Sequence, residues 1–181
     1  GDSRRPPRGE ILRSLGASLS LGANYESVLL AAGIRTEFPD EVLRDAERAA
    51  AEPISPAGRL DLREVAILTI DGADAKDLDD AISLEKRRDG WLLGVHIADV
   101  SHYVREGSPT DKEAIARGTS VYFTDKVVPM LPECLSNGVC SLNAGTDKYA
   151  LSALITLDKQ GKIKDCRVEN SIIRSKVRGV Y

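Results

Sequence analysis

The stretch Thr69-Ile70-Asp71-Gly72-Ala73-Asp74-Ala75-Lys76-Asp77-Leu78-Asp79-Asp80-Ala81 places five aspartates within ten residues. A mainly apolar run over residues 65–68 comes before it, and another over residues 81–84 follows it. Short apolar runs of this kind are typical of buried strands, and Gly72 allows the backbone to turn sharply where the first strand ends. The pattern predicts two neighbouring strands joined by an acidic loop.

The aspartates of this loop repel one another when they are ionised. Each pair about 5 Å apart costs roughly 3 kcal/mol at an effective dielectric near 20. Such a loop stays ionised if it is fully solvated or if a cation binds in it, and hard oxygen ligands suit magnesium, manganese or calcium. Because the cluster lies between two apolar runs, we favour a divalent metal site over a solvated acidic turn.

Two other acidic motifs fit the stretch less well. An EF-hand calcium loop needs oxygen ligands at positions 1, 3 and 5 and Gly at position 6. Counted from Asp71, position 3 is Ala73 and position 6 is Lys76, and counted from Asp77 the pattern fails at position 5. A phosphatase-like Asp-x-Asp loop directly follows a strand, whereas Asp77-Leu78-Asp79 begins six residues after Asp71. A magnesium phosphatase acting on small phosphate esters is therefore a weaker alternative.

Composition allows one globular domain, or one domain and the remnant of another, because the chain has 181 residues and 42% of them are hydrophobic. No apolar run is long enough to span a membrane and the sequence shows no signal-peptide pattern at its start, so no membrane partner is expected. The three cysteines, Cys134, Cys140 and Cys166, form no CxxC pair, and with two histidines they do not predict a zinc site. Scattered cysteines fit reduced thiols, which favours a cytoplasmic location.

The formal net charge of −3 is concentrated in the acidic stretch. Residues 71–80 carry five aspartates and Lys76, a net charge of −4, so the rest of the chain has a net charge of +1. Basic residues gather near both ends of the chain: Arg4, Arg5, Arg8 and Arg13, then Lys159, Lys162, Lys164, Arg167, Arg174, Lys176 and Arg178. Any one of them alone is more often solubilising surface, but basic clusters beside an acidic metal site suit a polyanionic substrate.

The first third of the chain differs in composition from the rest. Residues 1–22 are rich in Arg, Pro, Gly and Ser, and residues 9–16 have the pattern of a lone strand that belongs to a sheet upstream. Asn24 is placed to cap a short helix that Gly33 ends, and a second helix is expected after Pro39. Prolines after this second helix predict a domain boundary near residues 52–60.

The remaining sequence predicts a mixed α/β fold. Strands are expected over 65–70 and 120–123, hairpins over 81–86 with 91–98 and 151–157 with 163–174, and a turn or short helix over 99–104. Thr110 is expected to cap a helix that runs through Ile115. Residues 131–148 are expected to form an ordered loop, because apolar residues recur among its Pro, Asn and Gly. His96 alternates with apolar neighbours and is expected to be structural, whereas His102 is expected at the surface.

Several stretches of the sequence resemble motifs of the ribonuclease II/ribonuclease R family of exoribonucleases and come in the same order. The residues in these stretches are more similar to ribonuclease R than to ribonuclease II. The stretches are residues 34–49, 69–81, 94–104, 117–123 and 129–142. The stretch 69–81 is similar to the catalytic motif of the family. The resemblance implies a mixed α/β (α+β) fold that is a partial RNB catalytic domain. It also implies that residues 1–22 end an upstream cold-shock (OB) region, residues 23–59 form a helical linker, and residues 60–181 form the N-terminal half of the RNB domain.

The resemblance implies hydrolytic, processive 3′-to-5′ degradation of RNA to nucleoside 5′-monophosphates. Four catalytic aspartates match family residues that hold Mg²⁺, for which Mn²⁺ can substitute: Asp71, Asp77, Asp79 and Asp80. Asp74 has no such match and is expected to be solvated. Tyr122 matches an aromatic residue that stacks on RNA bases, and Tyr181 matches one that positions the 3′-terminal nucleotide and sets the final product length. The expected partner is the 3′ end of single-stranded RNA.

The sequence departs from the family in two ways. Lys148 stands where the family often has arginine, which weakens the case for a bidentate phosphate contact there. The family's catalytic arginine, a further glutamate, its second aromatic clamp residue and its S1-type domain have no counterpart in these 181 residues. We therefore expect little or no activity from the chain alone. The alternative is a non-catalytic RNA-binding or scaffold protein that keeps the fold.

Overall fold

The computed structural model describes residues 9–18, 20–124 and 126–181, and the chain forms two compact units, Gly1–Glu37 and Phe38–Tyr181. The first unit contains helix α1 (Leu21–Ala31), whose N-terminus is capped by the Ser20 hydroxyl accepting from the Ala23 N–H at 3.1 Å. The helix thus begins before Asn24, which was the wrong cap. Residues 9–18 contain no strand, so that expectation is also wrong, because a lone segment has no partner for its backbone groups. Arg4, Arg5 and Arg8 lie outside the described residues.

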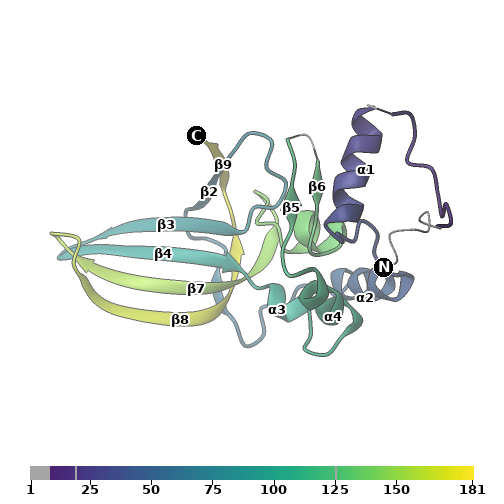
Figure 1. Ribbon diagram of the computed structural model, residues 1–181. Helices are drawn as coiled ribbons and strands as arrows, with labels where there is room; N and C mark the ends of the chain where they lie inside the picture. Colours follow the sequence, from purple (N-terminus) through teal and green to yellow (C-terminus); the bar gives the residue numbers. More distant parts are fainter. Residues whose placement is uncertain (1–8, 19, 125) are drawn as a thin grey trace. The chain divides into compact units, whose positions relative to one another are not determined.

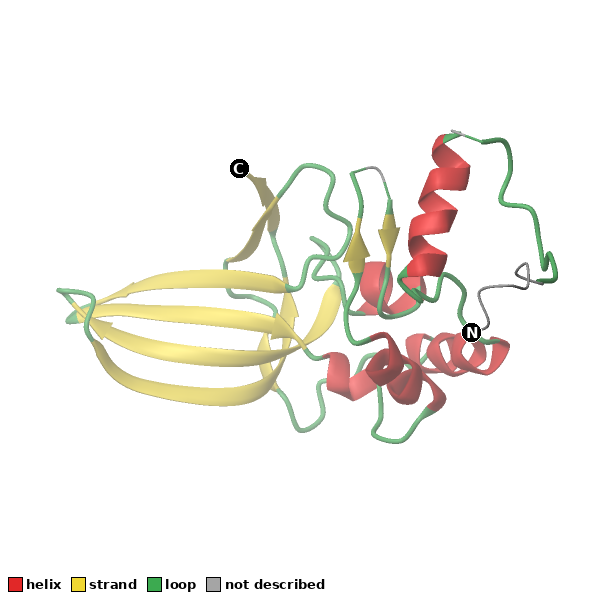
Figure 2. Cartoon of the chain, viewed as in Figure 1, coloured by secondary structure: helices red, strands yellow, loops and turns green. Residues whose placement is uncertain are grey.

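A seven-stranded mixed sheet dominates the second unit, with strand order β1-β8-β7-β4-β3-β2-β9 (Figures 1 and 2). The strands are β1 (Leu60–Leu62), β2 (Ile67–Asp71), β3 (Asp80–Arg87), β4 (Gly90–Ala98), β7 (Asp147–Asp158), β8 (Ile163–Arg174) and β9 (Val177–Val180). The five inner strands pair antiparallel, whereas the edge strands β1 and β9 pair in parallel with β8 and β2. The predicted mixed α/β class is confirmed.

Both long hairpins occur where the sequence predicts them. The turn between β3 and β4 ends at Gly90, which has φ 151° and faces Asp158 of β7. A Cβ on Gly90 would lie 1.9 Å from the Leu157 carbonyl oxygen, so the close approach of the two hairpins requires glycine here. Gly161, with φ 80°, turns the chain between β7 and β8. A second, smaller sheet pairs β5 (Val121–Tyr122) with β6 (Val127–Val128), and only its first strand was predicted.

Four helical segments contribute side chains to the core of this unit. They are α2 (Asp40–Ala50), α3 (Val100–Tyr103), α4 (Pro109–Arg117) and the irregular helical turn η1 (Cys134–Val139). Side chains from α2, β2, the acidic loop, η1 and β7 share one buried cluster, which includes Ala46, Ile67, Leu78, Leu135 and Tyr149. Ser108 rather than Thr110 caps α4, because Thr110 instead donates through both its N–H and its hydroxyl to Asp45 of α2, at 3.2 and 2.7 Å. This pair of hydrogen bonds joins α2 to α4.

The two histidines both have structural partners. His96 is fully buried on β4, and its ring nitrogens lie 3.1 Å from the Ser83 hydroxyl and 2.7 Å from the Ser152 hydroxyl. Burial lowers the pKa of His96 to about 4, so the ring is neutral at pH 7 and its structural role is confirmed. The surface position expected for His102 is wrong: its ring is partly buried, 4.2 Å from that of Tyr149 and 3.3 Å from the Arg59 guanidinium.

Candidate metal and RNA site

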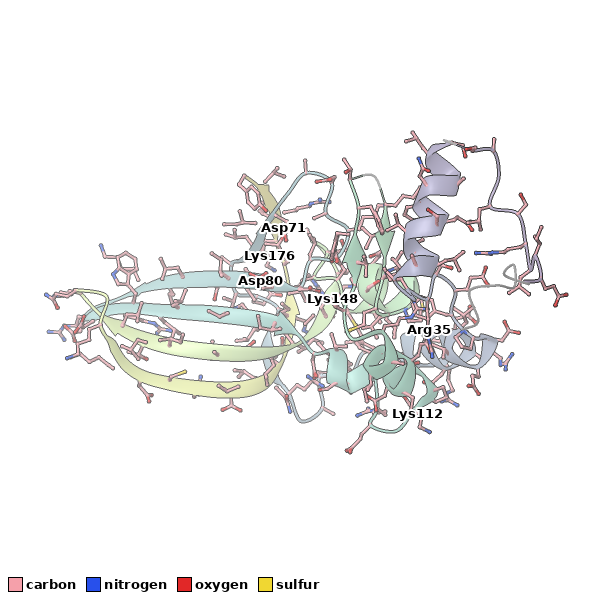
Figure 3. All side chains as sticks on the ribbon, viewed as in Figure 1. Arg35, Asp71, Asp80, Lys112, Lys148 and Lys176 are labelled. Atoms are coloured by element: carbon pink, nitrogen blue, oxygen red, sulfur yellow. The ribbon has the colours of Figure 1, made fainter. Side chains whose placement is uncertain are left out.

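The acidic loop joins neighbouring antiparallel strands, as the sequence predicts. Asp71 is the last residue of β2 and Asp80 is the first residue of β3. The strands pair through Ile67 with Ser83 and Leu68 with Ile82, and the same register continued toward the loop brings Asp71 opposite Asp79. In Figure 3 the labels of Asp71 and Asp80 lie close together at this end of the two strands. The two ends of the acidic loop therefore belong to neighbouring strands of the sheet.

The four aspartates singled out by the family resemblance act on one another electrostatically. The pKa of Asp79 is raised, first by desolvation and then by the negative charges of Asp77, Asp80 and Asp71. A carboxyl with three like-charged neighbours resists ionisation unless a cation offsets the repulsion. Asp74 is exposed to solvent, as expected. The structure thus places the charges of Asp71, Asp77 and Asp80 near enough to act on Asp79.

One oxygen of this group has no hydrogen-bond partner. The Oδ2 atom of Asp71 is buried and accepts no hydrogen bond from any residue that the structure describes. A buried carboxylate oxygen without a partner is costly, and such atoms are normally satisfied by a donor, an ordered water or an ion. Oxygen-only ligands with an unsatisfied lone pair match the preferences of Mg²⁺ and Mn²⁺, so the residues fit the cofactor that the resemblance implies.

The carboxylates do not by themselves form a closed metal cage. Within the described part of the chain, no three His, Cys, Asp or Glu side chains are arranged as a ready-made metal site. Magnesium commonly keeps several waters and takes only one or two carboxylates, with substrate phosphate completing its coordination. An open arrangement of this kind suits a cation shared between protein and a phosphate-bearing ligand.

Ser141 holds the second half of the loop in place. Its buried hydroxyl accepts from the Leu78 N–H at 3.0 Å and donates to the Lys76 carbonyl at 3.0 Å. The Leu142 N–H adds a hydrogen bond to the Leu78 carbonyl at 2.8 Å, and the Leu78 side chain is buried in the core. Asp77 and Asp79 flank Leu78, so these hydrogen bonds also restrain the backbone that carries the two aspartates. Sequence reasoning noted the stretch 140–142 only as part of the resemblance and missed this role.

Tyr122 combines an exposed ring with a contact to the acidic loop. The residue is 65% exposed, and its hydroxyl donates to Asp77 Oδ2 at 3.1 Å. Desolvation, the Asp77 charge and this hydrogen bond raise the pKa of Tyr122, so its hydroxyl stays protonated as a donor. An accessible aromatic face beside a carboxylate group is suited to stacking on a nucleobase near a metal-bound phosphate.

Tyr181 follows β9 and is 90% exposed. Strand β9 pairs in parallel with β2, and Val180 faces Asp71 in that register. Tyr181 therefore comes directly after the residue that pairs with the first metal-ligand candidate. Neither this position nor β9 itself was predicted as part of the sheet from the sequence.

The ammonium group of Lys148 has a hydrogen-bond partner within the protein. Its side chain is buried, and its ammonium group donates to the Gly138 carbonyl at 2.6 Å (Figure 3). Burial lowers the pKa of Lys148. The Lys148 amine therefore joins β7 to η1 through this hydrogen bond.

Residues 59–181 match the model of the RNB domain family, so the chain belongs to that family. Within it, the relatives similar to this chain include ribonuclease R of Thermotoga maritima, which is 54% identical over 148 residues, 80% of this chain and 21% of the relative. The structure of Mycoplasma genitalium RNase R in complex with ribose-methylated single-stranded RNA superposes with a TM-score of 0.82 at 38% identity. That match covers 88% of this chain and 25% of that one.

A further solved structure shows the same fold at lower identity. Yeast Ssd1, described as a pseudonuclease, superposes with a TM-score of 0.78 at 24% identity over 92% of this chain and 22% of its own. The chain thus spans about a fifth to a quarter of the length of these proteins. None of the helices in the described part of the chain is long and apolar enough to cross a membrane.

Proposed function

We propose that this chain carries the metal-binding end of a processive 3′-to-5′ exoribonuclease that hydrolyses RNA to nucleoside 5′-monophosphates with Mg²⁺ or Mn²⁺. The proposal is supported by the effect of the Asp71, Asp77 and Asp80 charges on Asp79, and by one buried oxygen of Asp71 that has no partner among the described residues. Family membership supports the proposal, because similar relatives are ribonuclease R proteins and one of them was solved with single-stranded RNA. We also propose a cytoplasmic location for this activity.

Each of the site's residues has a distinct task in this function. Bound divalent cations would activate a water and relieve negative charge on the leaving oxygen of a phosphodiester. The four aspartates would hold the cations at the ends of β2 and β3, and Ser141 keeps the backbone between them in place. The exposed Tyr122 ring would stack on a base, which is worth about 1–3 kcal/mol with little sequence preference. Tyr181 would place the 3′-terminal nucleotide.

We further propose that the 181-residue chain binds cation and RNA but turns over little RNA alone. The chain spans 21% of the Thermotoga relative, and the resemblance implies further catalytic residues that these 181 residues do not contain. Binding and catalysis must therefore be measured separately.

The test incubates 5′-labelled single-stranded RNA with the chain in magnesium or in EDTA, and measures both binding and degradation. Asp80→Asn is the test variant and Asp74→Asn is the control, because both remove one carboxylate from the same loop. We expect magnesium to strengthen RNA binding by the wild-type chain and by Asp74→Asn but not by Asp80→Asn. If the labelled RNA is degraded, we expect a ladder of products that shorten from the 3′ end. Magnesium-independent binding that is equal in all three proteins would instead indicate a non-catalytic RNA-binding protein.

A further inference from the structure

Arg178 of β9 reaches across the sheet edge to the first half of the acidic loop. Its Nη2 atom donates to the carbonyl oxygens of Gly72, Ala73 and Ala75, at 3.3, 3.0 and 2.8 Å. Within the same segment the Ala75 N–H donates to the Gly72 carbonyl at 3.1 Å. One guanidinium group thus donates hydrogen bonds to three carbonyl groups of a loop that has few regular backbone hydrogen bonds. Arg178 acts on residues 72–75 much as Ser141 acts on residues 76–78.

Strand β9 lies unusually close to β2 at the next residue. A Cβ on Gly179 would lie 2.9 Å from the Thr69 carbonyl oxygen, which is closer than side-chain carbons normally approach. The Lys176 N–H donates to the Ile67 carbonyl at 2.8 Å, and Arg178 pairs with Thr69 in the parallel ladder. The strand that leads to Tyr181, β9 in Figure 1, is therefore held to β2 by its backbone. The Arg178 side chain holds the same strand to the acidic loop.

We propose that Arg178 is a positioning residue that joins the strand of Tyr181 to the aspartate loop, and so sets the separation between the 3′-terminal nucleotide and the metal-binding carboxylates. The roles of Tyr181 and of the carboxylates rest on the proposed function. The contact that Arg178 makes with the loop rests on the geometry alone. The edge strand β9 pairs only with β2, so the Arg178 side chain adds a second connection between β9 and the acidic loop.

The contact is tested in metal-free protein by amide hydrogen exchange on the millisecond-to-second timescale. Arg178→Met keeps the aliphatic stem and removes the donors, and Arg167→Met is the matched control, because Arg167 is an exposed arginine of β8 on the other side of the sheet order. We expect exchange in residues 71–77 and 177–181 to rise about tenfold in Arg178→Met, because hydrogen bonds from a charged group are lost. Arg178→Lys, which retains a single charged donor group, should rise less.

Two results would overturn the proposal: exchange in Arg178→Met that equals that of Arg167→Met, or a uniform rise over the whole chain. A second measurement follows the Tyr181 ring signals by NMR while Mn²⁺ is added. Broadening that is strong in the wild-type chain and weaker in Arg178→Met supports the proposed separation, and equal broadening contradicts it. If Mn²⁺ affects neither protein, the metal site of the proposed function fails, while hydrogen exchange alone still decides whether Arg178 holds the loop.

Discussion

Replacing Ser141 by alanine should loosen the aspartate loop without touching an aspartate. The Ser141 hydroxyl makes two hydrogen bonds of 3.0 Å, and both Ser141 and Leu78 are at most 1% exposed. Each buried hydrogen bond contributes about 1 kcal/mol, and a buried N–H left without a partner adds a penalty of about 1–3 kcal/mol. We therefore expect Ser141→Ala to lower the free energy of unfolding by about 3–5 kcal/mol.

Urea unfolding of the metal-free chain measures this loss. Ser136→Ala is the control, because Ser136 belongs to the same segment and its hydroxyl makes only a marginal contact of 3.4 Å with Asn137 Oδ1. The control should change the free energy of unfolding by less than about 0.5 kcal/mol, as is usual for substitutions that remove no important contact. Because Asp77 and Asp79 flank Leu78, Ser141→Ala should also weaken Mn²⁺ binding. Equal stability of the two variants would refute the account of how the loop is held.

Three further predictions concern the sheet and the Tyr122 ring. Burial lowers the pKa of His96 to about 4, below its ordinary value of 6.5, so the unfolded chain binds the proton more readily. Stability should therefore be fully present above pH 6.5 and fall by roughly 3 kcal/mol as the pH drops toward 4, and this His96-linked loss should be absent in His96→Gln when unfolding is measured across that range. Tyr122→Ala should weaken single-stranded RNA binding by about 1–3 kcal/mol in fluorescence anisotropy, whereas Tyr122→Phe keeps the stacking ring, so equal losses would contradict a stacking role. Gly90→Ala should destabilise the chain far more than Gly161→Ala in thermal unfolding, because an added Cβ meets the Leu157 carbonyl at Gly90 and meets nothing within 4 Å at Gly161; similar losses would contradict the close packing of the hairpins.

Local patterns predicted those elements that local contacts determine. The two long hairpins follow from alternating apolar residues and turn glycines, and α2 follows from its apolar spacing after Pro39. Strands β1 and β9 were not predicted, because each has at most four residues and pairs in parallel with a strand more than a hundred residues away. Thr110 was the wrong helix cap because its hydroxyl is taken by Asp45, which lies 65 residues away.

The same distinction applies to the candidate site. The four aspartates lie in one short stretch, so their crowding and the family resemblance were readable from the sequence. The groups that hold this stretch, Ser141 and Arg178, lie 63–65 and 103–106 residues from their partners, and no periodic pattern marks such contacts. The assignment of Asp71, Asp77, Asp79, Asp80, Tyr122 and Tyr181 to metal and RNA stays a prediction, as do the boundaries at residues 22 and 59.

The central claim is that the gathered aspartates bind a divalent cation, and calorimetric titration of the chain with Mn²⁺ tests it most directly. Asp79→Asn removes the carboxylate whose pKa is raised by desolvation and by the charges of Asp77, Asp80 and Asp71, and Asp74→Asn removes a carboxylate of the same loop that is not among the charges acting on Asp79. The account predicts binding by the wild-type chain and by Asp74→Asn, with affinity at least about tenfold weaker in Asp79→Asn, the equivalent of about 1.4 kcal/mol. Equal affinity in all three proteins, or no binding by the wild-type chain, would contradict it.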